Sequence, residues 1–302
     1  PLTAFLASYI NNDSTALLAT AIIIYAWILG LESNWKTKHC ILLGIGIGFC
    51  ALTYYNAYGY ILCSIIICLT SVISNKMKIK EILQKVLIVA SIAFLIAGWW
   101  FIRNAIIYDG DFLGLNAQIE CGDKYAQEEY KPSKRPTPQR QNQSIIDMLF
   151  NMGWIHYTSR SFVGIFGYHN IVMSNKIYYC YFAIWAVALI GIIMKFKELF
   201  VYKNKEKNKY LLNYIFVLSI IIPICLSMYY SYSSDFQPQG RYVMPMIIPF
   251  MYFIVQGIQK ILEKFVKSPV LKNIIITLLI LLIIFISFKA LCGYVIPAYR
   301  LK

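Results

Sequence analysis

The sequence predicts an all-α integral membrane protein, on three observations. Hydrophobic residues make up 59% of the 302 residues, against about half in an ordinary soluble domain. They occur in long uncharged runs, each close to the ~20 residues that a helix needs to cross ~30 Å of hydrocarbon. The charged residues lie mainly between these runs. Strands of a membrane barrel would alternate apolar and polar residues, and these runs do not.

Eight apolar runs predict eight membrane-spanning helices in one transmembrane domain that covers residues 1–302. Their bounds are about 14–31, 40–56, 58–74, 86–102, 177–194, 211–231, 243–259 and 274–293. Tyrosines fill the short link 54–60 between the second and third runs. They suit a turn at the membrane edge, where the ring is apolar and the hydroxyl is wet. The chain begins at Pro1 with neither a methionine nor a signal peptide, so we expect a fragment of a longer chain.

The net charge of +14 comes from lysines that lie between the apolar runs. Because membrane proteins concentrate lysine in cytoplasmic loops, this pattern predicts a multi-pass protein of the plasma membrane and does not favour nucleic acid as a partner. Arg241 is the only basic residue in the short connections of the opposite side. The lysines expected in the cytoplasm are Lys36 and Lys38; Lys76, Lys78, Lys80 and Lys85; Lys195, Lys197, Lys203, Lys205, Lys207 and Lys209; and Lys260, Lys264, Lys267 and Lys272.

The connection 103–176 is too long for a simple link, and the alternation of charge places it outside the cytoplasm. It holds half of the 14 acidic residues, and its middle, 131–143, is rich in proline and polar residues, which predicts irregular structure. We expect 144–152 to form a short amphipathic helix at the outer membrane surface. Ser144 would cap this helix, and Asp147 stands at the capping-box position.

Cysteines and short motifs give no support to several kinds of chemistry. Eight cysteines occur, seven of them in or beside apolar runs and none in a CxxC pair, so neither a zinc site nor a disulfide framework is indicated. A phosphate-binding loop, a dinucleotide fingerprint, HExxH and GxSxG are all absent in any supporting context. ATP-driven and hydride-transfer chemistry therefore have no basis in the sequence.

Two groups of polar residues border apolar runs on the predicted outer side. Asn11-Asn12-Asp13 precedes the first span. It is either a helix N-cap or a set of carboxylate and amide groups that bind sugar hydroxyls or a metal held by a phosphate. Trp99–Asn104 ends the fourth span and is followed by 108–111. An aromatic belt with a snorkelling arginine explains the tryptophans, and it explains Arg103 less well, because an outer arginine breaks the charge pattern.

The third group is 235–242, followed by two prolines in the next span. One interpretation is a tight turn with an interfacial Arg241 paired with Asp235. The other is a phosphate clamp, because a planar guanidinium makes bidentate bonds to phosphate oxygens and Gly240 lets the backbone approach closely. A fourth, weaker candidate is 154–170, which contains His156, Arg160 and His169. Its residues are mostly apolar, which favours packing at the membrane surface over acid–base chemistry.

Four motifs occur in a fixed order along nearly the whole chain: Asn11-Asn12-Asp13; Trp99…Arg103-Asn104 with Tyr108-Asp109-Gly110-Asp111; Ser161-Phe162…Phe166-Gly167; and Gln239-Gly240-Arg241-Tyr242…Pro245. This set resembles bacterial membrane proteins of the GT-C glycosyltransferase superfamily, in an uncharacterised branch marked by a Q-G-R-Y-x-x-P signature. Protein O-mannosyltransferases and the aminoarabinose transferases of lipid A are similar at a greater distance.

The resemblance implies a GT-C-like fold and transfer of a sugar from a polyprenyl-phosphate donor, on the outer face, to a glycan, lipid or protein acceptor of the cell envelope. It implies a catalytic carboxylate ahead of Pro1, so the catalytic residue is not assigned within this chain. No resident cofactor is expected, and a divalent cation is the one candidate. The residues expected to bind substrate are Asn12, Asp13, Arg103, Asn104, Gln239, Arg241 and Tyr242.

Two other functions stay open at this point. A carrier or flippase for polyprenyl-linked glycans would use the same arginine to bind phosphate without making a bond. A non-catalytic subunit of an envelope-assembly complex would need neither phosphate binding nor bond formation. Charged residues spread along several spans would favour transport, and the span interiors hold almost none.

Overall fold

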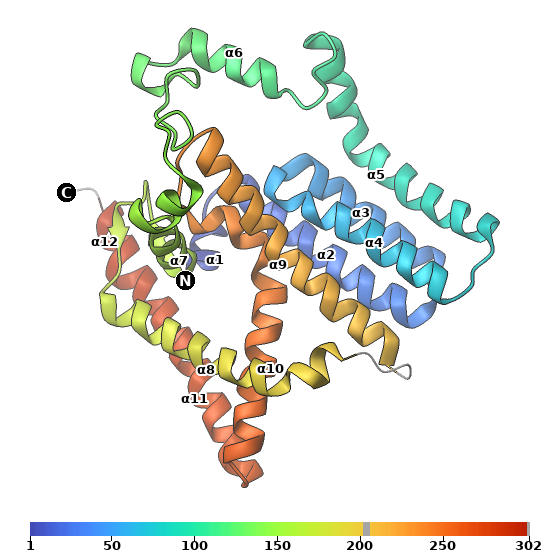
Figure 1. The fold of residues 1–302 in the computed structure, drawn as a ribbon, viewed down its shortest axis with the longest axis vertical. Coiled ribbons are helices and arrows are strands. Elements are labelled where there is room, and N and C mark those ends of the chain that lie inside the picture. The colour runs from blue at the N-terminus through green and yellow to red at the C-terminus, as the bar shows by residue number, and fades with distance from the viewer. Residues whose placement is uncertain (202–205, 301–302) are drawn as a thin grey trace. The chain divides into compact units, whose positions relative to one another are not determined.

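The computed structural model describes residues 1–201 and 206–300, and 79% of it is helical (Figure 1). Seven apolar helical segments are long enough to span a membrane: Asn12–Ser33, Tyr55–Ser74, Ile79–Ile107, Asn175–Phe200, Lys207–Ser233, Gly240–Phe265 and Pro269–Tyr299. The eighth predicted span corresponds to α3 (Thr37–Thr53), an apolar helix of 17 residues. At 1.5 Å per residue α3 is about 25 Å long, a little short of the hydrocarbon thickness. The all-α, multi-pass prediction is therefore confirmed.

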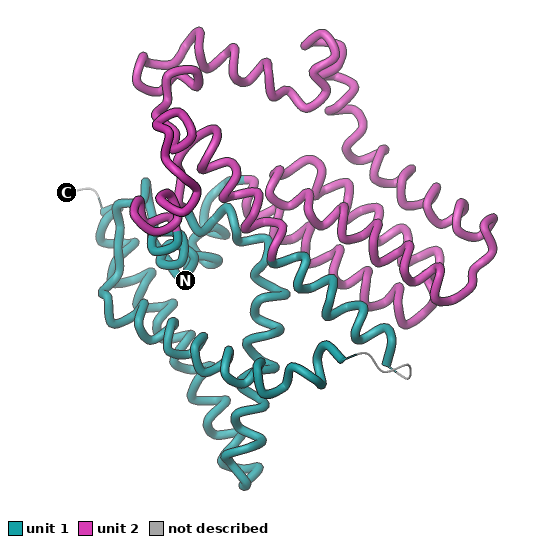
Figure 2. Tube along the Cα trace, viewed as in Figure 1, with its two compact units in different colours: residues 1–11, 155–220, 239–302 teal, residues 12–154, 221–238 magenta. Residues whose placement is uncertain are grey.

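The chain divides into two compact units, which are described separately (Figure 2). Unit 1 consists of residues 1–11, 155–220 and 239–302, and unit 2 of residues 12–154 and 221–238. Helix α9 (Lys207–Ser233) contributes its first half to unit 1 and its second half to unit 2.

Unit 2 is built on α2 (Asn12–Ser33), α3, α4 (Gly59–Ser74) and α5 (Ile79–Ile107), with a short 3-10 turn, η1 (Tyr55–Ala57), before α4. Helix α3 packs against both α2 and α5. Glycines make these contacts close: a Cβ at Gly44 or Gly48 would lie 2.8 Å from a side chain of α5. Small residues serve this purpose in membrane helices because packing, not water exclusion, drives their association.

Two buried tryptophans tie α4 to the rest of unit 2. Trp27 stacks on Tyr60 with ring centroids 5.6 Å apart, and its indole N–H donates to Ser64 Oγ at 3.0 Å. Trp35 donates in the same way to Ser71 Oγ at 3.0 Å. A buried indole N–H needs an acceptor, and in an apolar span the serine hydroxyls supply it.

The long connection of unit 2 carries α6 (Leu115–Tyr125), a 3-10 turn η2 (Glu128–Tyr130) and a π-helical turn η3 (Asp147–Asn151). The capping box is confirmed: the Asp147 N–H donates to Ser144 Oγ at 3.0 Å, and the Ser144 N–H donates to the Asp147 carboxylate at 3.2 Å. The helix that follows is shorter than expected and is a π-turn, with Met148 fully buried and Ile145 exposed.

Unit 1 combines short and long helices around one small hairpin. The short segments are α1 (Leu2–Leu6), α7 (Trp154–Gly164), the 3-10 helix η5 (Gly240–Met246), the π-turn η6 (Leu291–Val295) and α12 (Ile296–Tyr299). The long helices are α8 (Asn175–Phe200), α10 (Ile247–Phe265), α11 (Pro269–Ala290) and the first half of α9. Strands β1 (Ile165–Phe166) and β2 (Ile171–Val172) pair antiparallel, with Ile165 opposite Val172.

Helices α8 and α10 cross with backbone contact in unit 1. A Cβ at Gly191 would lie 1.9 Å from the carbonyl oxygen of Gly257, and a Cβ at Gly257 would lie 2.1 Å from that of Ala188. Their C-terminal ends lie together, because Lys195 donates to the Gln256 side chain at 2.7 Å. A second side-chain pair, Lys260 with Glu198, joins the same ends.

In each unit, therefore, helix ends or connections that are rich in lysine lie next to one another. In unit 2 the α2–α3 and α4–α5 connections meet, since Lys85 Nζ donates to the carbonyl oxygens of Asn34 and Trp35, each at 2.7 Å. In unit 1 the lysine-rich ends of α8 and α10 meet. These pairs agree with the predicted alternation, while the cytoplasmic assignment itself stays a prediction. Lys203 and Lys205 lie outside the described residues.

Candidate functional site

The Q-G-R-Y motif forms η5, a 3-10 helix that leads into α10. Its Gly240 lies directly on the backbone of α7: a Cβ there would be 2.1 Å from the Phe162 nitrogen and 2.4 Å from the Ser161 carbonyl carbon. Only glycine permits this approach. Two motifs that are almost eighty residues apart in the sequence, Ser161-Phe162 and Gly240-Arg241, therefore meet in unit 1.

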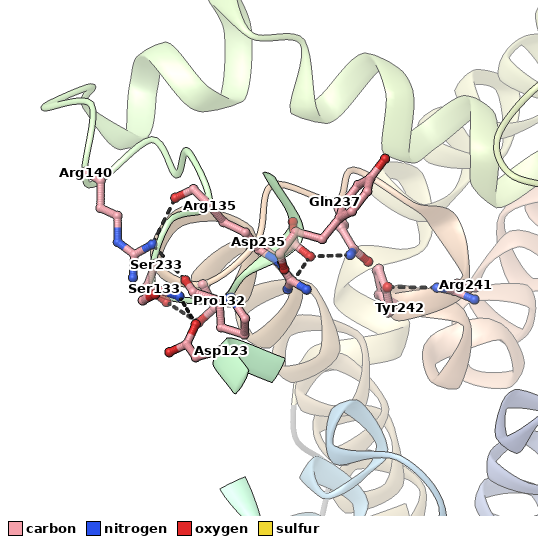
Figure 3. Close-up of polar contacts among 12 residues, drawn as sticks. Asp123, Pro132, Ser133, Arg135, Arg140, Ser233, Asp235, Gln237, Arg241 and Tyr242 are labelled. Atoms are coloured by element: carbon pink, nitrogen blue, oxygen red, sulfur yellow. Dashed lines mark hydrogen bonds and ion pairs between the residues drawn. The ribbon is translucent and has the colours of Figure 1, made fainter. Parts of the chain in front are cut away.

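Arg241 is half-buried and is oriented by the residue that follows it. Its Nη2 donates to the Tyr242 hydroxyl at 2.9 Å, as Figure 3 shows, and its guanidinium carbon lies 4.9 Å from the centre of the same ring. The Tyr242 side chain is 8% exposed. Gln239 contributes its backbone, because its carbonyl oxygen accepts the Tyr242 N–H at 3.2 Å. The turn thus fixes a cation against an aromatic ring.

His169 lies in the turn between β1 and β2 and joins Arg241 in one polar group. Its backbone is left-handed, with φ of +67°, and its Nε2 shares a hydrogen bond of 3.0 Å with Ser161 Oγ. Burial lowers the pKa of His169, and the positive charge of Arg241 lowers it further. The imidazole is accordingly neutral near pH 7. We call Ser161, His169, Arg241 and Tyr242 the arginine cluster.

The rest of the weaker candidate stretch has a structural explanation. The Arg160 guanidinium lies over the Tyr178 ring, 4.3 Å from its centre, and donates to Asn175 Oδ1 at 2.7 Å. Tyr178 in turn donates to the Gly164 carbonyl at 2.7 Å. His156 is exposed on α7. The ring contact and the hydrogen bond give Arg160 a structural role, whereas His169 belongs to the arginine cluster. The sequence did not connect His169 with Arg241, because the strands of the hairpin that places it are only two residues long.

Asn12 and Asp13 occupy the first turn of α2 in unit 2. Asn12 is exposed, and its amide donates to the Thr53 carbonyl at 3.4 Å. Asp13 is 5% exposed, and a carboxylate at this end of a helix is stabilised by the backbone N–H groups. This position agrees with the helix-start interpretation. That the two residues share a cavity with Arg241, as the resemblance implies, stays a prediction.

Arg103 and Asn104 lie at the end of α5 and hold the turn that follows it. Asn104 is 1% exposed, and its amide donates to the Phe112 carbonyl at 3.4 Å. Arg103 is exposed; it donates to Asn104 Oδ1 at 2.9 Å, with its guanidinium carbon 5.3 Å from the Trp100 ring centre. These contacts fit an interfacial arginine, and a role in substrate binding remains a prediction.

Asp235 belongs to an ion pair that sequence reasoning missed. Its carboxylate accepts from Arg135 Nη1 at 2.9 Å and from Gln237 Nε2 at 2.6 Å (Figure 3). The same loop is bonded to α9 through the Gln139 N–H, which donates to the Tyr232 carbonyl at 3.2 Å. The predicted irregular segment 131–143 is irregular, and it is tied down at the end of α9. Arg135 could not be matched to Asp235 from a separation of one hundred residues.

Comparison with known proteins gives no further guide: no protein family, curated protein or solved structure matches the chain. Within residues 1–201 and 206–300, His, Cys, Asp and Glu side chains form no group of three or more that could hold a metal ion. What the structure establishes at this level is a polytopic helical membrane protein with an arginine cluster at one end of α10.

Proposed function

We propose that this protein is a membrane glycosyltransferase that moves a sugar from a polyprenyl-phosphate donor to an acceptor of the cell envelope on the outer membrane face. The observation that carries the proposal is the arginine cluster. It joins two of the four motifs on which the GT-C resemblance rests, through the backbone contact of Gly240 with Phe162. Both motifs fall on the side of the membrane that the lysine pattern makes external.

The cluster has the chemistry that a phosphate ligand requires. A guanidinium binds two phosphate oxygens at once, and it holds its full charge at any physiological pH. The Tyr242 hydroxyl and ring set the direction of Arg241. Since the imidazole of His169 is neutral, it adds a hydrogen-bonding group beside Ser161 without a second positive charge. Partial burial makes each of these interactions stronger than it would be in water.

In the proposed step the acceptor oxygen forms a bond to the anomeric carbon as the bond from that carbon to the phosphate oxygen breaks. The electron pair leaves with the polyprenyl phosphate, and the acceptor proton passes to a base. Arg241 stabilises the charge that develops on the leaving phosphate. We give the role of base to no residue of this chain.

The test is sugar transfer by membranes from a strain that expresses the protein from its own locus. Membranes receive radiolabelled polyprenyl-phosphate hexoses, and label in the envelope fraction is measured against a deletion strain. We expect Arg241→Ala to lower transfer about a hundred- to thousandfold, the usual cost of a lost charge at a developing oxyanion. Arg241→Lys should rescue little, because an ammonium is a point charge. Arg140→Lys, an exposed arginine bonded to loop carbonyls, is the matched control and should stay near wild type.

Two outcomes would contradict the proposal. Near-normal transfer by Arg241→Lys would remove the phosphate-binding role and return Arg241 to an interfacial anchor. Label that reaches the outer leaflet on its lipid without transfer, and that depends on Arg241, would instead identify a carrier of polyprenyl-linked sugars.

A further inference from the structure

An open pocket of about 360 Å³, called the cavity below, lies at the lysine-rich end of unit 2. Its lining shares no residue with the arginine cluster, and its proposed role does not depend on sugar transfer. Its lining comes from the α2–α3 and α4–α5 connections and the first turns of α5: Asn34, Asn75, Lys76, Met77, Lys78, Glu81 and Lys85. The volume is within the range of small-ligand sites. Three lysines and one glutamate contribute to this lining, and none of the three lysines is ion-paired in the part of the chain that the structure describes.

The cavity is held in shape by buried contacts. Trp35 is 3% exposed and left-handed, with φ of +58°, and its indole joins the α2–α3 connection to Ser71 of α4. Lys85 is fixed from α5 by its bonds to the Asn34 and Trp35 carbonyls. Lys76 is left-handed as well, with φ of +49°. The walls are thus preorganised, and the Lys76 and Lys78 ammonium groups are left to meet a ligand.

We propose that this cavity binds the phosphate of an anionic membrane lipid. Positive charge selects an anion, and the amino end of α5 adds favourable backbone dipoles. A lipid is favoured over free phosphate because the helices that meet here expose large apolar side chains beside the lysines. Ile73 on α4 is 75% exposed, and Ile79 and Leu83 on α5 are 70% and 62% exposed. A lipid would lay its acyl chains on these residues with its headgroup among the lysines.

The test uses the purified chain in detergent and three probes: phosphatidylglycerol, phosphatidylcholine and glycerol phosphate. Native mass spectrometry measures how much of each stays bound. Lys76→Gln with Lys78→Gln removes two charges from the cavity. Lys38→Gln with Lys80→Gln is the matched control, because it removes two exposed charges from the first turns of α3 and α5 without touching the lining. One lysine near an anionic surface contributes about fivefold in affinity, so we expect the first pair to weaken phosphatidylglycerol binding about twentyfold and the control pair to leave it unchanged.

Met77→Trp gives a second test, since it fills the half-buried lining without changing charge. It should displace the lipid while the melting temperature of the lipid-free protein stays near wild type. Equal loss of binding in the two lysine pairs would show attraction by diffuse surface charge and overturn the proposal. Glycerol phosphate bound as tightly as phosphatidylglycerol would overturn the lipid assignment and leave a site for free phosphate esters.

Discussion

The turn 239–246 in unit 1 and the turn 108–114 in unit 2 are built on opposite plans. The first carries Arg241 just ahead of α10, and the second follows Arg103 near the end of α5; each arginine donates to the side chain of the next residue at 2.9 Å. In the first turn, Gly240 and 242–246 are buried, and the backbone rests on α7. In the second, most residues are exposed, and backbone and side-chain hydrogen bonds together close the turn without resting it on another helix.

The two arginines differ in what positions them: a close backbone contact in one case and exposed aromatic side chains in the other. Arg241 is positioned by a turn that cannot shift, because its glycine already touches another backbone. Arg103 lies on exposed rings, Trp100 and Tyr108, next to a turn that side-chain hydrogen bonds close. A rigid, partly buried guanidinium suits a ligand that must be met in one geometry, whereas an exposed one suits an interface. This contrast favours Arg241 over Arg103 as a substrate-binding residue, although both belong to the sequence motifs.

The largest effect should come from a methyl group at Gly240. In Gly240→Ala the new Cβ meets the backbone nitrogen of Phe162, which cannot rotate away as a side chain could. We expect a loss of at least about 3 kcal/mol in unfolding free energy, at the high end for overpacking. In Gly110→Ala the new Cβ has no atom within 4 Å, and only the backbone φ of +93° at this position is unfavourable for alanine. That variant should lose about 1–2 kcal/mol. The melting temperatures of the two variants are measured in detergent. Equal losses of stability would show that the close contact between Gly240 and Phe162 does not matter for stability.

The two arginines should differ in the transfer assay. Arg103→Lys keeps the charge and can still lie on the aromatic rings, so we expect less than about a tenfold loss. This compares with about a hundredfold or more for Arg241→Lys. If both lysine variants lose transfer activity equally, Arg103 binds substrate as directly as Arg241 does. Burial and a rigid turn would then not distinguish a substrate-binding arginine from an interfacial one.

A smaller effect tests how the exposed turn is closed. The Asp111 carboxylate accepts the backbone N–H groups of Leu115 at 3.2 Å and Ala117 at 3.0 Å, which caps α6. Asp111→Ala should cost about 1 kcal/mol. Asp111→Asn should recover only part of this loss, because its amide has one oxygen to accept a bond where the carboxylate has two. Hydrogen exchange at 115–117 should accelerate in the alanine variant. Gln239→Ala, in the buried turn, should change the unfolding free energy little, because it is the backbone carbonyl of Gln239 that accepts the Tyr242 N–H. Unchanged exchange in Asp111→Ala would contradict the capping role.

The sequence predicted what local patterns encode. Apolar runs located the helices, and Ser144 with Asp147 predicted the capping box, because each signal lies within one turn of chain. The pairing of Arg135 with Asp235 was out of reach, since it depends on how a long loop folds back.

The arginine cluster was predicted only in part, for the same reason. The motif identified Arg241, but nothing in the spacing shows that Gly240 rests on Phe162 or that His169 lies beside Ser161. Those contacts require the hairpin, whose strands are two residues long and have no alternation to detect.

The smallest effect concerns His169 and pH. Its pKa is lowered in the folded protein by burial and by Arg241, so the unfolded chain binds more protons between that value and about 6.5. The contribution of His169 to stability should therefore fall as the pH drops through this window and stay constant above it. Glu128 has its pKa lowered to about 2, and the carboxyl groups of Asp123 and Asp147 also have lowered pKa values. These carboxylates lose their contribution only as the pH falls through the acid range.

His169→Asn should remove the His169 part of this dependence, and asparagine tolerates the left-handed backbone at this position. Melting temperatures between pH 8 and pH 5 should then fall less in the variant than in the wild type. His156→Asn, an exposed histidine on α7, is the matched control and should follow the wild-type curve. A variant curve parallel to the wild type would mean that the imidazole does not sense the charge of Arg241, and would separate His169 from the arginine cluster.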